Sequence, residues 1–247
     1  AAGYGSSFPI DRQLTTDLLA FDNMNYNVVY AQMGRGKCER IVAQALGSVA
    51  ATLSKFAYDV CLFNSQNFGF IKLPDEFTTG SSIMPHKKNP DVFELVRAKC
   101  NKIQSLANEL TLISNNLPSG YFRDLQVLKE SYLEVFEYLL SCIDIVNYAL
   151  TRLEVKTDIL NDDKYKFIYS VEDVNREVLD GKPFREAYKL VGEKIQNNTY
   201  QPRKEVKHTH QGSIGNLCNT EITEKFERIL GNFNSEKIQQ AESKLLN

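Results

Sequence analysis

The sequence predicts an all-α protein, in which a bundle of long helices is followed by a small helical domain. Apolar residues recur at alternating three- and four-residue spacing over three long segments, which is the pattern of amphipathic helices that pack side by side. Stretches rich in Gly, Pro, Asn and Ser separate these segments and are typical of turns. No sustained period-two alternation, the pattern of a half-buried strand, interrupts them.

The composition is that of an ordinary globular protein. The chain has 247 residues, of which 43% are hydrophobic and 24% charged, enough to bury a sizeable core. Its net charge is −2 at pH 7, without a basic block, so nucleic-acid binding is not expected. No apolar run approaches the roughly 20 residues that a membrane-spanning helix needs, so we expect no membrane association either.

The cysteines and histidines are few and scattered. The five cysteines show no Cys-x-x-Cys spacing, and three lie inside apolar helical patterns. We therefore expect reduced, buried thiols, which suits a cytoplasmic protein. They are Cys38, Cys61, Cys100, Cys142 and Cys218. Because the chain has only three histidines, we expect no metal site.

The chain opens with the small-residue stretch "AAGYGSSFPIDR" rather than with Met. This stretch has neither the charged n-region nor the apolar h-region of a signal peptide. We expect that the sequence starts within a longer polypeptide.

The first helices are expected over residues 12–22 and 27–65. The longer one carries a seam of apolar residues, which we expect to face the core. The seam consists of Ile41, Ala45, Val49, Leu53, Phe56 and Val60. Gly34, Gly36 and Gly47 would each weaken an isolated helix by about 1 kcal/mol relative to Ala. Since glycine also lets a neighbouring helix approach closely, a bundle is the natural setting.

Two further long helices are expected. Asn89 as N-cap and Pro90 at the first helical position are a start signal, and this helix should end before Pro118. After the turn "LPSGYF", the next helix is expected over residues 124–153. Helices of roughly 25 to 40 residues are about 40 to 60 Å long. Because apolar seams of that length extend beyond the core of one domain, we expect several copies of the chain to associate.

The pattern of the sequence changes from long to short amphipathic segments after residue 153. Short amphipathic pieces such as "SVEDVNREVLDGK" and "PFREAYKLVGEKIQ" alternate with polar joints. We therefore expect residues 1–153 to form the long-helix domain, incomplete on its N-terminal side, and residues 154–247 to form the small helical domain.

The loop "TTGSSIMPHKKNP", residues 78–90, is the candidate for chemistry. Loops of Gly, Ser and Thr are usually simple connectors, but this one leads into a helix N-terminus, where free backbone N–H groups favour an anion. Lys87 and Lys88 can add positive charge there, and Ser81 and Ser82 follow a flexible glycine. Such a site can stabilise a carboxylate that loses its α-proton to a serine base. The chemistry indicated is proton abstraction followed by elimination.

Within this loop, "GSSIMPHKKNP" resembles the signature of the fumarase/aspartase superfamily. The flanking "FGFIKLPDEF" and "LPSGYFRDLQVLKE" resemble the argininosuccinate lyase family, and "GKPFREAYKLVGE" resembles the C-terminal domain of that family. The resemblance covers essentially the whole chain. It implies reversible β-elimination of argininosuccinate to L-arginine and fumarate, without a cofactor, in arginine biosynthesis. It also implies a cytoplasmic homotetramer whose active sites are shared between subunits.

The resemblance also implies roles for individual residues. Ser81 corresponds to the base that takes the succinyl Cβ proton, Lys87 to the cation that stabilises the aci-carboxylate, and Glu94 to the carboxylate that orients a histidine. The positions that correspond to substrate-binding residues are Asn89, Tyr121, Gln126 and Lys129. Gln126 and Lys129 are three residues apart on the first turn of the expected helix, so they share a face.

Other interpretations of these residues stay open. Glu94 can be a first-turn acid favoured by the helix dipole, Tyr121 a turn-packing ring, and Lys129 part of a solvated face. Ser82 is as close to the chemistry as Ser81. For the protein as a whole, the alternatives are another superfamily lyase, such as adenylosuccinate lyase, and a non-catalytic structural homologue.

The sequence also departs from the family pattern. Phe122 stands where the family usually has Asn, and His86 where it often has Gln. "NVVYAQMGRGK" keeps Arg35 but lacks the usual acidic residues, so Arg35 is a lesser candidate for substrate contact. "HTHQ", residues 208–211, resembles the family's catalytic Thr-His-x-Gln segment but lies near the C-terminus, and we expect a surface loop there.

The family's own Thr-His segment, which carries the general acid, would precede residue 1. The resemblance therefore implies that this chain is the C-terminal portion of a lyase and is inactive by itself. "YGSSFPIDR" matches only the first half of the superfamily signature, and we expect it to have no catalytic role.

Overall fold

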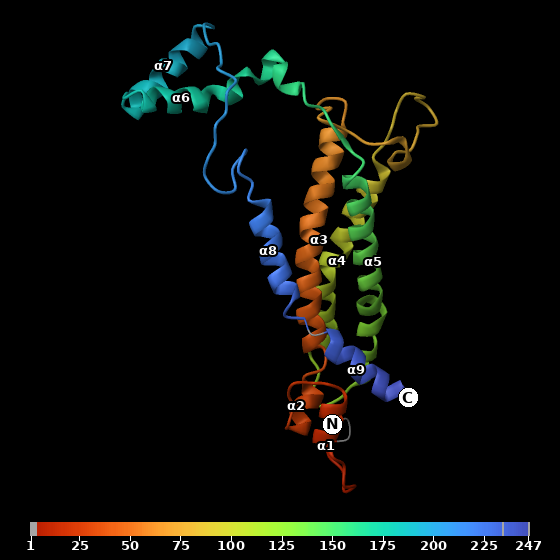
Figure 1. Cartoon of the computed structure of the whole chain (residues 1–247). Helices are drawn as coiled ribbons and strands as arrows, with labels where there is room; N and C mark the ends of the chain where they lie inside the picture. The colour runs from red at the N-terminus through yellow and green to blue at the C-terminus, as the bar shows by residue number, and fades with distance from the viewer. Residues whose placement is uncertain (1–3, 234, 247) are drawn as a thin grey trace. The chain divides into compact units, whose positions relative to one another are not determined.

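A computed structural model of the chain describes residues 4–233 and 235–246. The described residues are mainly helical, which confirms the all-α prediction (Figure 1). They divide into two compact units, Ala1–Lys156 and Thr157–Asn247. We propose that these units correspond to the two domains expected from the sequence.

The first unit is built around three long helices that run alongside one another (Figure 1). They are α3 (Lys37–Asn64), α4 (Asp91–Ser114) and α5 (Leu128–Leu150). α4 contributes large core side chains, and α3 contributes three fully buried alanines at seven-residue spacing, Ala43, Ala50 and Ala57. At Gly47 of α3, an added Cβ would lie 3.7 Å from the Cα of Gln104. Small residues on α3 therefore let its backbone approach α4 closely.

The predicted core face of α3 is correct only in the second half of the helix. Val60 is buried, and Leu53 and Phe56 are partly buried and pack against the core. In the first half, Ile41 and Val49 are 55% and 45% exposed. The alanine face packs inside the unit because it allows the closer approach to α4, and it leaves Ile41 and Val49 on the outer flank.

The single helix expected over residues 27–65 is also wrong. The chain forms α2 (Val28–Met33), breaks, and resumes as α3 at Lys37. The break lies at Gly36, which caps α3 with a φ of +82°, a left-handed conformation that favours glycine. Upstream, α1 (Arg12–Leu18) ends four residues before the expected residue 22.

The boundaries of the next two helices differ from expectation as well. Pro90, rather than Asn89, precedes the first residue of α4, and no side chain caps this helix. The backbone of Asn89 is instead paired with Thr79. Before α5, residues Arg123–Gln126 form the 3₁₀ turn η2 rather than the first turn of the α-helix.

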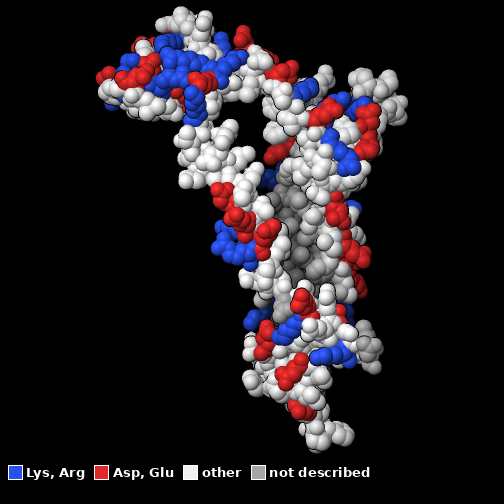
Figure 2. Space-filling view, in the orientation of Figure 1, with Lys and Arg blue, Asp and Glu red and all other residues white. Residues whose placement is uncertain are grey.

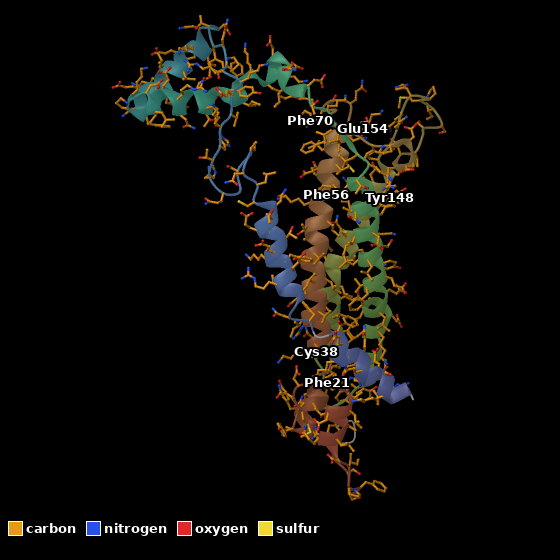
Figure 3. All side chains as sticks on the ribbon, viewed as in Figure 1. Phe21, Cys38, Phe56, Phe70, Tyr148 and Glu154 are labelled. Carbon is orange, nitrogen blue, oxygen red and sulfur yellow. The ribbon has the colours of Figure 1, made fainter. Side chains whose placement is uncertain are left out.

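Aromatic rings and a short strand pair lie at the end of the bundle that carries the loop. Phe56 of α3 meets Phe93 of α4 with ring centroids 6.2 Å apart, and Tyr148 of α5 meets Phe77 at 5.5 Å. Figure 3 labels Phe56 and Tyr148 on their helices. Phe77 belongs to the 3₁₀ turn η1 (Asp75–Phe77). The strands β1 (Ile71–Lys72) and β2 (Glu154–Val155) pair antiparallel and tie the chain after α3 to the chain after α5.

The second unit consists of short helices, as expected. Its elements are η3 (Ile159–Asn161), η4 (Asp163–Tyr169), α6 (Ser170–Leu179), α7 (Phe184–Gln196), α8 (Asn219–Leu230) and α9 (Ser235–Leu246). Its small core joins α6 and α7 through Val174, Ala187 and Val191. Tyr200 packs there too, and its hydroxyl donates to Asp173 at 2.7 Å.

Two composition-based expectations need correction. Within the described residues, α3 is long and apolar enough to cross a membrane, by length and composition only. Its alanine face packs in the α3–α5 bundle, and 17% of the apolar window is buried. The five cysteines are free thiols, but only Cys100 and Cys142 are buried, and Cys38 is exposed.

Candidate active site

The loop that carries the expected chemistry is closed at its base by a pair of backbone hydrogen bonds. Thr79 and Asn89 exchange N–H···O bonds of 3.0 and 2.9 Å, and the Thr79 hydroxyl donates to the Asp91 carboxylate. Between these residues, Gly80–Lys88 bulges into solvent, with Ile83 86% exposed. The closure fixes both ends of the loop at the start of α4, while its backbone bonds leave the Asn89 side chain available.

Ser81 sits in a tight turn within this loop. Its Oγ accepts the backbone N–H groups of Ile83 at 3.2 Å and of Met84 at 3.1 Å. Two donors aimed at one hydroxyl oxygen favour negative charge on it, which is the state that a serine base needs. Ser82 has no corresponding donor among the described residues, so the structure distinguishes the two serines where the sequence did not.

The two adjacent lysines of the loop have different surroundings. The Lys88 ammonium forms an ion pair with Asp75, and its hydrogen bond holds the pKa of that carboxyl below its usual value. The backbone N–H of Lys87 donates to the Met84 carbonyl at 3.1 Å. Its ammonium has no ion-pair or hydrogen-bond partner within the described part of the chain, and the residue is exposed. Lys87 is therefore available to an incoming anion, whereas Lys88 anchors the loop to η1.

Glu94 lies exposed on the first turn of α4. Its carboxylate is near Cys61, where it adds to the effect of burial in raising the pKa of that thiol. No hydrogen bond of its side chain is found among the described residues. Its position near the helix N-terminus is one that the dipole favours by itself.

The remaining predicted residues cluster at the turn between α4 and α5. The Gln126 amide donates to the phenol oxygen of Tyr121, and the backbone N–H of Tyr121 donates to the Tyr4 hydroxyl at 2.8 Å. The Arg35 guanidinium lies over the Tyr121 ring, 4.8 Å from its centroid. Lys129 is exposed on the first turn of α5. A cavity of about 130 Å³ beside this cluster is lined in part by Arg35.

Two contributors to this cluster were missed or undervalued in the sequence. Tyr4 belongs to the segment that was expected to have no role, and nothing in the local sequence indicates a contact with Tyr121, 117 residues away. Arg35 was considered only as a substrate contact. Its stacking on Tyr121 depends on how α2, α3 and the α4–α5 turn pack together.

The predicted site residues form two groups at opposite ends of α4 (Figure 1). Ser81, Lys87 and Asn89 precede this helix, Glu94 lies on its first turn, and the Tyr121 group follows its last turn. A helix of 24 residues spans about 36 Å. This separation exceeds the reach of a small-molecule substrate, so one copy of the chain does not bring both groups to one molecule.

Comparison with known proteins identifies the family. A family model described as "Lyase" matches residues 1–105. The argininosuccinate lyase of Parabacteroides distasonis is 63% identical over 246 residues, covering 100% of this chain and 55% of that protein. The chain belongs to the argininosuccinate lyase family. The Bacteroides fragilis member is 61% identical over the same length and share, and the Stenotrophomonas maltophilia member is 41% identical over 189 residues, 76% of this chain and 44% of that protein.

Argininosuccinate lyases at this level of identity are longer than the chain, which spans about half the length of the curated relatives it matches. Solved structures of the wider superfamily share its fold. An EDDS lyase in complex with formate has a TM-score of 0.61 and 20% identity, covering 80% of this chain and 40% of that one. The class II fumarase of Schistosoma mansoni has a TM-score of 0.59 and 20% identity, covering 75% and 41%. These likenesses confirm the predicted long-helix bundle of the fumarase/aspartase type.

In this argininosuccinate lyase family member, the "HTHQ" segment lies outside the helices of the second unit, in a loop as expected. His210 is exposed, but His208 is half-buried and its Nε2 lies 2.8 Å from the Glu172 carboxylate. His208 thus ties the loop to α6 of its own unit.

Proposed function

We propose that the protein to which this chain belongs is an argininosuccinate lyase, which reversibly cleaves argininosuccinate to L-arginine and fumarate. The observation that carries the proposal is the loop geometry. One loop presents a serine oxygen facing two N–H donors together with an unpaired lysine, at a helix N-terminus. Family membership supplies the substrate, because the relatives at 58–63% identity are named argininosuccinate lyases.

The proposed mechanism starts with proton transfer from the succinyl Cβ to the Ser81 alkoxide. Negative charge then develops on the adjacent carboxylate, where the Lys87 ammonium and the helix N-terminus stabilise it. The electron pair re-forms as the C=C bond of fumarate while the C–N bond breaks. The guanidino nitrogen takes a proton from a general acid that the rest of the enzyme supplies and leaves as arginine. Asn89 binds a substrate carboxylate. The reaction involves no change in redox state, so it needs no redox cofactor.

The Tyr121 group is proposed to bind the substrate from a different copy of the chain. Lys129 offers a charge and Gln126 an amide on neighbouring turns, which suits a carboxylate. Because this group lies about 36 Å from the Ser81 loop along α4, a complete site requires the loop of one copy and the turn of another. We propose that the whole protein is a cytoplasmic homotetramer that acts in arginine biosynthesis.

Exposed apolar side chains on the bundle support this assembly. Ile41 and Val49 of α3 and Leu133 and Leu140 of α5 are 45% to 62% exposed in a single copy. Figure 2 shows an uncharged stretch along part of the visible face of the bundle, with acidic side chains at its edge. Apolar surface of this extent favours association. Light scattering should therefore give a mass well above the 28.1 kDa of one chain.

The activity can be tested with a chimera that joins this chain to the part of the Parabacteroides distasonis relative that it does not match. We expect fumarate to form from argininosuccinate, measured by ultraviolet absorbance. Preferential cleavage of adenylosuccinate would assign the protein to another superfamily lyase. A folded, associated chimera that cleaves neither substrate would favour a non-catalytic structural homologue.

Sharing of the site can be tested by mixing two inactive chimeras, Ser81→Ala and Lys129→Met. If each site takes its loop and its turn from different copies, some sites in the mixed oligomer contain neither substitution. Co-expression should then restore part of the activity, although each variant alone is inactive. A mixture as inactive as its components would show that both groups act within one copy.

A further inference from the structure

Arg35 lies in the short break between α2 and α3, residues 34–36, which we call the elbow. Gly34 is the C-cap of α2 and Gly36 the N-cap of α3, so Arg35 is the single side chain between two glycines. At Gly36, an added Cβ would lie 3.3 Å from the Cβ of Ser114 and 3.6 Å from a methyl carbon of Leu125. The elbow is therefore pressed against the end of α4 and against η2, which leaves it little freedom to move relative to the α4–α5 turn.

From this elbow, the Arg35 guanidinium covers one face of the Tyr121 ring, with 4.8 Å between the guanidinium carbon and the ring centroid. A planar cation at that distance is attracted by the negative face of the aromatic ring. Guanidinium stacks flat on a ring, and the compact, strongly hydrated ammonium of lysine does not replace it. Arg35 therefore restrains the plane of the Tyr121 ring.

Tyr121 is restrained at two other points. Its backbone N–H donates to the Tyr4 hydroxyl at 2.8 Å, and Gln126 donates to its phenol oxygen. The preceding Gly120 has a φ of +134°, and an added Cβ there would lie 2.6 Å from the Tyr4 oxygen. With Gln126 donating to the phenol oxygen, the proton of the phenol remains available for an acceptor on a ligand.

From these contacts we infer that Arg35 is a positioning residue: it holds the Tyr121 ring so that the phenol donates to a carboxylate of the substrate. The inference rests on the proposed function for the identity of that substrate. It revises the interpretation of Arg35 as a direct substrate contact, because its guanidinium lies over the Tyr121 ring. Arg35 and Gln126 act on the same ring from different sides and prepare it before the substrate arrives.

The kinetic test uses the chimera and a double-mutant cycle. Arg35→Met should raise KM for argininosuccinate about tenfold and leave kcat within about twofold, because Tyr121 binds the ground state. Arg35→Lys should behave like Arg35→Met, since it restores charge without planar stacking. Arg40→Met, which removes an arginine side chain from the first turn of α3, is the matched control and should change KM less than twofold.

The second arm of the cycle separates positioning from direct contact. Tyr121→Phe keeps the ring but removes the hydroxyl group whose position Arg35 is inferred to fix. In that background, Arg35→Met should raise KM by less than about twofold more. The same tenfold loss in both backgrounds would overturn the inference and return Arg35 to direct contact with the substrate.

A spectroscopic readout tests the stacking without any activity. In protein labelled with 3-fluorotyrosine, the ¹⁹F resonance of Tyr121 is identified among those of the 12 tyrosines by its loss in Tyr121→Phe. Arg35→Met should shift this resonance, and Arg40→Met should not. An unshifted Tyr121 resonance in a folded Arg35→Met protein refutes the inference. If the parent chimera cleaves no argininosuccinate while the resonance shifts as expected, the proposed function fails and the Arg35–Tyr121 contact stands.

Discussion

The hydroxyl oxygen of Ser81 accepts the backbone N–H of Met84 at 3.1 Å, so the serine side chain folds back over its own loop. The N–H of Ile83 approaches the same oxygen. The neighbouring Ser82 lacks such donors within the described loop, although its sequence context is almost the same. Backbone geometry thus gives two consecutive serines different hydrogen-bond surroundings.

Ser81→Ala is expected to lower turnover of argininosuccinate at least about 10²-fold, because a positioned base is lost. Binding of the substrate, measured by calorimetry, should change little. Ser82→Ala is the matched control and should retain turnover within a few-fold. The reverse order of effects would transfer the base role to Ser82.

Lys87→Met should reduce kcat by about 10²-fold and affect affinity less, because the negative charge that it meets develops mainly in the intermediate. Lys88→Met removes a lysine that is already engaged with Asp75, so it should reduce kcat less than about tenfold. Steady-state kinetics of the two variants measure the two losses in kcat. Equal losses in kcat would mean that the structure assigns their roles incorrectly.

The Asp75–Lys88 pair should respond to acid in a defined direction. Lys88 holds the pKa of Asp75 below the ordinary 3.8, so the carboxylate is charged above that pH and the pair is lost as pH falls through the lower value. The ¹³C carboxyl resonance of Asp75 should therefore titrate below pH 3.8. Lys88→Met should raise this pKa towards 3.8, and Lys72→Met should raise it less, because Lys72 is the weaker neighbour. No change in Lys88→Met would exclude the ion pair.

Phe93→Ala should destabilise the first unit by about 3–5 kcal/mol in urea unfolding, because it empties a fully buried site beside Phe56. Ile83→Ala shortens a side chain that is 86% exposed in the loop and should change the free energy of unfolding by no more than about 0.5 kcal/mol. Similar effects for both variants would contradict the packing at the loop end of the bundle.

The cysteines should differ strongly in reactivity. Burial, followed by the neighbouring Cys142, raises the pKa of Cys100 to about 12. At pH 8 its thiolate fraction is on the order of 10⁻⁴, so an aromatic disulfide reagent should not modify it in the folded protein. Cys38 is exposed and should react first, and Cys38→Ser should remove that fast phase. Rapid labelling of Cys100 in folded protein would be inconsistent with the bundle core.

The sequence predicts the buried face of a helix where burial follows the local spacing of apolar residues. Val96, Ile103 and Leu110 recur at seven-residue spacing in the sequence, and all three are buried in α4. On α3 the expected seam is buried only towards Val60, whereas Ile41 and Val49 are exposed because the alanine face gives the closer packing against α4. Periodicity identifies that a helix has an apolar face, but it does not say which neighbour covers that face.

The candidate site was predictable only in its local part. A short motif contains Ser81 and Lys87, and the resemblance assigns their roles directly from the sequence. The contacts that the sequence did not predict, Asp75 with Lys88 and Tyr4 with Tyr121, join residues 13 and 117 positions apart. Such contacts depend on how whole elements pack, and neither partner has a local signal that points to the other.

The length of α4 has a consequence for which changes in the chain can be tolerated. A residue inserted into this helix advances everything after it by 1.5 Å and rotates it by about 100°. Even an insertion of seven residues, which nearly restores the rotation, would move the Tyr121 turn about 10 Å further from the Ser81 loop. Side chains on the outer surface can be exchanged without this effect. The length of α4 from Asp91 to Ser114 therefore sets the distance between the Ser81 loop and the Tyr121 turn, whatever the identity of the residues in between.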